Sequence, residues 1–81
     1  MDELKAFTIR AYGKTELAQL YLPDNTPGSA LQAFMRWIKG DKELLENLQA
    51  TGFHKFQKGF TPKQVRILID YFEAPPGYVE L

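Results

Sequence analysis

The apolar residues of this 81-residue chain recur mostly at spacings of three and four, which places them on one face of a helix. Three such stretches cover residues 15–22, 27–40 and 42–50, and a fourth starts at residue 62. In the second stretch, the predicted buried face consists of Leu31, Phe34, Met35 and Ile38. The pattern therefore predicts four helices that pack around one core.

Capping residues and prolines mark where these helices begin and end. Thr26 is a suitable N-cap before Pro27, because proline at the first helical position loses no hydrogen bond. Thr61 and Gln64 have the spacing of a capping box at the start of the last helix. The prolines at positions 75 and 76 stop that helix.

Two segments outside the helices have the character of short strands. Residues 6–11 alternate apolar and polar side chains, which is the period of a half-buried strand. Residues 53–60 carry three phenylalanines and a glycine, which suits a hairpin or an ordered loop. We expect these two segments to pair beside the helices, with an ordered core over residues 6–75 and a loose tail over 77–81.

The predicted fold class is therefore mainly α. We expect a single domain over residues 1–81, a compact four-helix unit of helix-turn-helix type. The small two-stranded β element makes it similar to a winged helix. One departure is the connection over residues 22–29, which contains two prolines and is longer than the three- or four-residue turn of that motif.

A series of short motifs also indicates a family. In order along the chain, the motifs are Glu16-Leu17-Ala18, Leu20-Tyr21, Pro23, Ala30-Leu31, Arg36-Trp37-Ile38, Leu44, Leu48, Gly52, Phe60-Thr61-Pro62, Gln64-Val65 and Tyr71. Over residues 12–75 the chain resembles a family of short, uncharacterised bacterial proteins classed as a domain of unknown function. The resemblance implies a compact helical domain and no particular activity. Such proteins usually close with Gly-Glu-Pro after the last helix, where this chain has Glu73-Ala74-Pro75, so the exact end of that helix stays open.

The charge of the chain is balanced in total and uneven in distribution. Ten basic and ten acidic side chains cancel, whereas non-specific nucleic-acid binders are visibly basic. Acidic residues are nevertheless absent from residues 25–40 and 47–69. A site-specific binder remains compatible with this composition, because the placement of charge matters more than its sum.

The exposed face of the second predicted helix is the main candidate site. This face carries hydrogen-bond donors at helical spacing, namely Ser29, Gln32, Arg36 and Lys39. Gln pairs well with adenine and Arg with guanine in a major groove, and Lys14 is placed to contact a phosphate. The alternative is an ordinary solvated face, since Gln, Arg and Lys are common helix formers.

A second candidate is the acid-free segment before and within the last helix. It carries four basic side chains, namely Lys55, Lys58, Lys63 and Arg66. Next to a reading helix, such a segment would grip the DNA backbone. It would equally serve as a solvated loop that keeps the protein soluble.

The aromatic residues allow two further interpretations. Tyr21 and Trp37 flank the buried stripes and would anchor a partner or dimer surface if exposed, or else pack within the protein. The phenylalanines at positions 53, 56 and 60 would suit base stacking, although the core has the stronger claim on them.

The residue inventory argues against catalysis. The chain has no cysteine and one histidine, His54, with no carboxylate spaced to orient it. We expect no enzyme activity, no cofactor and no metal site. No apolar run reaches the roughly 20 residues of a membrane span, and the N-terminus lacks a secretory pattern, so a cytoplasmic protein without a membrane partner is expected.

The sequence thus predicts a small DNA-binding regulatory or accessory protein. Its second helix would read the groove of double-stranded DNA and its basic loop would clamp the backbone. The alternative is a protein-interaction module or a small homodimer with no nucleic-acid role, which the zero net charge favours.

Overall fold

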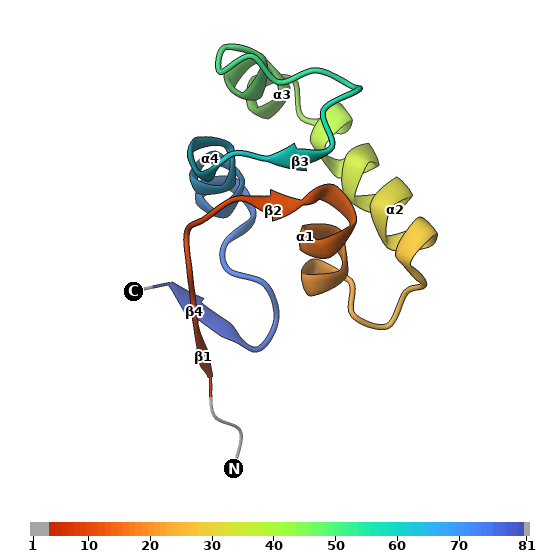
Figure 1. The fold of residues 1–81 in the computed structure, drawn as a ribbon, viewed down its shortest axis with the longest axis vertical. Coiled ribbons are helices and arrows are strands. Elements are labelled where there is room, and N and C mark those ends of the chain that lie inside the picture. Colours follow the sequence, from red (N-terminus) through yellow and green to blue (C-terminus); the bar gives the residue numbers. More distant parts are fainter. Residues whose placement is uncertain (1–3, 81) are drawn as a thin grey trace.

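The computed structural model describes residues 4–80, and over these residues the chain folds into four helices and two small sheets (Figure 1). The helices are α1 (Lys14–Tyr21), α2 (Pro27–Gly40), α3 (Lys42–Gln49) and α4 (Pro62–Phe72). The strands are β1 (Lys5–Phe7), β2 (Tyr12–Gly13), β3 (Gly59–Phe60) and β4 (Tyr78–Glu80). The prediction of a mainly α fold with a small β element is confirmed.

The helices pack in sequence order, α1 against α2, α2 against α3 and α3 against α4. Figure 1 shows β2 and β3 between α4 and α2, while β1 and β4 lie together at the end where the N-terminus emerges. Asp41 joins α2 to α3 and caps the second of them, because its Oδ1 accepts a hydrogen bond of 3.0 Å from the Leu44 backbone N–H.

Phe34 of α2 lies at the centre of the core and is fully buried. Its ring stacks on that of Tyr21 in α1, with 5.2 Å between centroids. The rings of Phe72, Trp37 and Phe60 lie 5.7, 6.0 and 6.1 Å away. One side chain of α2 therefore contacts α1, β3 and α4.

The buried face of α2 differs from the predicted one. The fully buried residues are Ala30, Phe34 and Ile38, which follow one another at intervals of four. Leu31 and Met35 are only half-buried. They lie one position further along the helix, a rotation of about 100°, which turns them away from the core.

The segment before α4 does pair with a strand near the N-terminus, but the predicted partner, residues 6–11, is wrong. The strand that pairs with β3 is β2, with Tyr12 opposite Phe60 and Gly13 opposite Gly59 in an antiparallel arrangement. The two backbones approach closely, because a Cβ atom on Gly59 would lie 2.6 Å from the Tyr12 carbonyl oxygen. A contact of that length explains why glycine occupies position 59.

The C-terminal tail is also more ordered than predicted. Residues 78–80 form β4, which pairs in parallel with β1, and residue 81 lies outside the described residues. Phe7 of β1 is buried between two rings, stacked on Tyr12 at 5.3 Å and edge-on to Tyr78 at 6.0 Å. The tail is ordered because Tyr78 covers an apolar side chain that β1 alone leaves exposed.

The helix boundaries lie close to the predicted ones. α1 begins and ends one residue earlier than residues 15–22, and α3 ends at Gln49. The capping box of α4 is present, with the Gln64 N–H donating to Thr61 Oγ1 at 3.2 Å and the Thr61 N–H donating to Gln64 Oε1 at 3.0 Å.

α4 ends at a backbone conformation that favours glycine. Glu73, the residue after α4, has φ 65° and ψ −179°, a region that glycine alone adopts without strain. Its carbonyl oxygen accepts a hydrogen bond of 2.5 Å from the hydroxyl of Tyr21, which ties this end of α4 to α1. The resembling proteins usually have glycine at the corresponding point of their Gly-Glu-Pro motif.

We therefore expect Glu73→Gly to stabilise the protein. Relief of the strained conformation outweighs the added flexibility of the unfolded chain, for a net gain of about 1 kcal/mol. Glu73→Ala is the matched control, since it removes the same carboxylate and keeps the strain. Urea denaturation of both variants measures the difference in the free energy of unfolding. Equal values for the two variants would show that the backbone at residue 73 is not strained.

Phe34→Ala should destabilise the protein by about 3–5 kcal/mol, because it leaves a cavity where four aromatic rings meet. Phe56→Ala is the matched control, since Phe56 is 78% exposed and its loss should change stability by about 0.5 kcal/mol or less. Thermal unfolding followed by circular dichroism compares them. A similar melting temperature for both variants would show that α2 does not direct Phe34 into the core.

Candidate functional site

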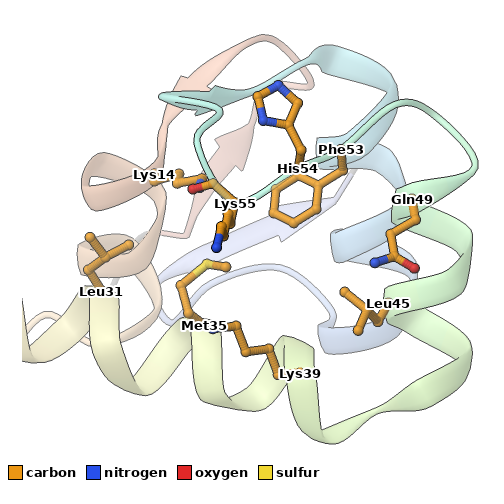
Figure 2. A pocket seen from close by; sticks show the side chains of 9 residues that line it. All are labelled: Lys14, Leu31, Met35, Lys39, Leu45, Gln49, Phe53, His54 and Lys55. Carbon is orange, nitrogen blue, oxygen red and sulfur yellow. The ribbon is translucent and has the colours of Figure 1, made fainter.

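A groove of about 560 Å³ lies between α2, α3 and the segment that follows α3 (Figure 2). Its apolar lining consists of Leu31, Met35, Leu45 and Phe53, and its polar lining consists of Lys14, Lys39, Gln49, His54 and Lys55. Figure 2 shows Lys55 reaching from the upper segment toward Met35, with Lys14 and Lys39 on two other sides. No carboxylate lines this groove in the part of the chain that the structure describes.

Lys14 couples α1 to the segment above the groove. Its backbone N–H donates to the Lys58 carbonyl at 3.2 Å, and its Nζ donates to the Lys55 carbonyl at 3.1 Å. The same Nζ lies 5.2 Å from the ring centroid of Phe53. Partial burial, and then the positive charge of Lys39, lower the pKa of Lys14.

The exposed face of α2 continues from the groove into a second hollow. This hollow has a volume of about 380 Å³ and is lined by Leu31, Gln32, Met35, Arg36 and Lys39. Lys39 belongs to both hollows, so the predicted reading face of α2 and the lysine-rimmed groove form one continuous surface.

Two carboxylates on the helices beside this surface, one on α1 and one on α3, are engaged by other side chains. Glu16 pairs with Arg10 at 3.2 Å, and Glu43 accepts a hydrogen bond of 2.8 Å from the Tyr71 hydroxyl on α4. The Arg10 side chain and the Gly13 N–H also lower the pKa of Glu16, through hydrogen bonds of which the backbone one is the larger cause. A chain with no net charge therefore still has a locally basic surface.

Some predicted contact residues lie away from this surface. Arg66 of α4 forms an ion pair of 2.6 Å with Glu80 of β4, and Lys63 is exposed at the start of α4. Ser29 is engaged at the start of α2, where its N–H donates to Thr26 and its hydroxyl accepts from Asn25. Of the four basic residues of the predicted clamp, only Lys55 therefore lines the groove, while Lys58, Lys63 and Arg66 line neither hollow.

A buried amide orders the segment that carries Lys55 and Lys58. The Gln64 side chain is 1% exposed. Its Nε2 donates to Thr51 Oγ1 at 2.9 Å, and its Oε1 accepts from the Thr61 N–H and from the Gln57 amide. Gln57 also donates to the Gly59 carbonyl at 2.5 Å. The sequence predicted the capping role of Gln64, whereas its burial and its bonds to Thr51 and Gln57 depend on the fold.

Of the two aromatic residues proposed for a partner surface, only Trp37 reaches the surface. Tyr21 is 8% exposed, and its burial raises the pKa of its hydroxyl. Trp37 is 42% exposed and packs edge-on against Phe34 and Phe72. Tyr21 therefore belongs to the core and is no candidate for a partner surface.

The three phenylalanines of the predicted stacking set divide into two groups. Phe53 and Phe60 stack on each other at 5.7 Å in the core. Phe56 is 78% exposed, and the Lys55 ammonium group lies 5.1 Å from its ring centroid. Of the three, only Phe56 is therefore on the surface, where a base or a partner could contact it.

The apolar lining of the groove was missed from the sequence. Leu31 and Met35 were assigned to the core, yet both are half-buried and face the groove, as Leu45 of α3 does. The available signal was the width of the apolar stripe on α2, which spans more of the helix than Ala30, Phe34 and Ile38 alone occupy.

The described residues include no group of three His, Cys, Asp or Glu side chains that could hold a metal ion. Over the same part of the chain, no helix has the length and apolar character needed to cross a bilayer.

A family model described as "Domain of unknown function (DUF4248)" matches residues 8–75, so the chain belongs to this family. No curated protein and no solved structure matches the chain significantly. The family assignment agrees with the resemblance found in the sequence and brings no activity with it.

Gln64→Leu should cost about 2 kcal/mol of stability, because it leaves the buried partners of Gln64 without hydrogen bonds. The loss of stability should be greatest over residues 51–60, so amide hydrogen exchange should accelerate more there than in α2. Gln32→Leu is the matched control on an exposed position and should leave both quantities nearly unchanged. Unaltered exchange over residues 51–60 in Gln64→Leu would contradict the ordering role of this amide.

Proposed function

We propose that this member of the family binds duplex DNA as a small regulatory or accessory protein. The reading element is the exposed face of α2. The segment over residues 55–58, together with Lys14, forms the backbone clamp. The observation that carries the proposal is the convergence of Lys14, Lys39 and Lys55, from three separate segments, beside that face.

The side chains along α2 have the chemistry of base recognition. Gln32 and Arg36 are one helical turn apart and exposed, and both line the second hollow. A glutamine amide matches the donor and acceptor of adenine, and an arginine fork matches the two acceptors of guanine. Lys39 is the third member of this face and suits a phosphate.

The packing of α1 on α2 supports a unit of helix-turn-helix type. Ala18 and Ala30 are both fully buried, and such small side chains let two helices approach closely. The connection over residues 22–26 is only slightly longer than the three or four residues usual in that motif. Lys14 opens α1, the helix that would cross the DNA backbone.

The loop over residues 55–58 supplies the features of a clamp. Lys55 and Lys58 are exposed, and Phe56 between them is exposed as well. Two of the backbone carbonyls of this loop are held by Lys14, which keeps the loop next to the start of α1. A basic loop that is anchored in this way loses little conformational entropy when it binds phosphates.

The second candidate function is protein binding or self-association without a nucleic-acid role. Phe56, at 78% exposed, and Trp37, at 42% exposed, favour it, because exposed aromatic side chains often anchor protein interfaces. Phe56, the more exposed of the two, gives this alternative its own test, separate from the lysines.

The test is binding to random duplex DNA at low and moderate salt, followed by sequencing of the retained fragments. The wild-type protein should bind in a salt-sensitive manner, with log K falling by about 0.9 per log unit of salt for each phosphate contact. Arg36→Ala/Lys39→Ala should lose at least about tenfold in affinity and its sequence preference. Lys5→Ala/Lys63→Ala is the control, because it removes two charges from outside the proposed surface.

The outcomes separate the candidate functions. Equal losses in both double variants would overturn α2 as the reading element. No binding by the wild-type protein at low salt would overturn the DNA proposal. Light scattering of the wild type and of Phe56→Ser then tests whether the protein self-associates through Phe56.

A further inference from the structure

The groove between α2, α3 and residues 53–55 has the composition of a small-molecule site. Four of the nine lining residues are apolar, and they come from α2, α3 and the segment after it. The volume of about 560 Å³ lies within the roughly 300–1,000 Å³ usual for ligand sites. We call these four apolar side chains the floor of the groove. A DNA phosphate backbone makes no use of apolar side chains, so contacts with DNA do not account for the floor.

The charges around this floor all have the same sign. Lys14, Lys39 and Lys55 line the groove, and neither Lys39 nor Lys55 forms an ion pair with any carboxylate of residues 4–80. Lys14 uses one of its three N–H groups on the Lys55 carbonyl, so two remain for a ligand. The repulsion between Lys14 and Lys39, which contributes to the lowered pKa of Lys14, would be relieved by a bound anion.

We infer that this groove binds a small organic anion that consists of an apolar body and one carboxylate or phosphate group. The body lies on Leu31, Met35 and Leu45, and the charged group meets Lys39 and Lys55. Figure 2 shows the Lys55 side chain reaching over this floor, with Gln49 at one end. The Met35 thioether is flexible and polarisable, which lets the floor adapt to the body of the ligand.

The inference stands apart from the proposed DNA binding, because its test contains no DNA. The probe is octanoate, titrated into the isotopically labelled protein and followed by the amide signals and the Met35 methyl signal. We expect saturable shifts at Leu31, Met35, Leu45 and Phe53. The matched ligand is 1-octanol, which has the same chain without the charge and should bind at least about tenfold more weakly.

Two protein variants test the role of the lysines. Lys39→Gln/Lys55→Gln removes two positive charges from exposed positions, so the fold should be retained, and octanoate should bind at least about tenfold more weakly. Lys5→Gln/Lys63→Gln loses the same charge elsewhere and should bind like the wild type. Unfolding curves of both variants check that their folds are intact.

Three results would overturn the inference. The first is equal binding of octanoate and 1-octanol, because the lysines would then not recognise the charge. The second is an equal loss in both double variants, which would indicate general charge attraction. The third is a response to inorganic phosphate as strong as that to octanoate, since the apolar floor would then contribute nothing.

Discussion

The contacts of the Phe34 ring are the interaction on which the rest of the structure depends. α1 and α3 each have eight residues, and isolated helices shorter than about 12–15 residues are marginal in water. Such helices persist only where packing holds them. Phe34 stacks on Tyr21 of α1 and contacts Phe60 of β3 and Phe72 of α4. A single ring therefore joins elements that are far apart along the chain.

The candidate site follows from this core. Phe60 brings β3 into the core, and β3 then pairs with β2 at the start of α1. The close approach of Gly59 to Tyr12, together with the bonds of Gln64, fixes the segment over residues 51–60 above α2. Lys55 of that segment thus lines the groove because apolar packing, a buried amide and the hydrogen bond from Lys14 to its carbonyl hold its backbone there.

Net charge is a poor guide to the surface of this protein. Several acidic side chains are engaged: Asp41 caps α3, Glu80 pairs with Arg66, and Glu43 accepts a hydrogen bond from Tyr71. Within residues 4–80, no acidic side chain lines either hollow beside α2, so the basic side chains there have no carboxylate next to them. Lys39 and Lys55 take part in both proposed activities, so an anion in the groove would compete with a DNA phosphate for the same ammonium groups.

The sequence by itself determined the features that depend on near neighbours. The starts of α2 and α4 were predictable because a cap such as Thr61 bonds to a residue three positions away. The exposed face with Gln32 and Arg36 was predictable from helical spacing alone. Only the tertiary structure decided that β1 pairs with β4, that Tyr21 is buried, and that Leu31 and Met35 line a groove. Those outcomes depend on which distant segment covers each side chain, and local periodicity carries no information about that choice.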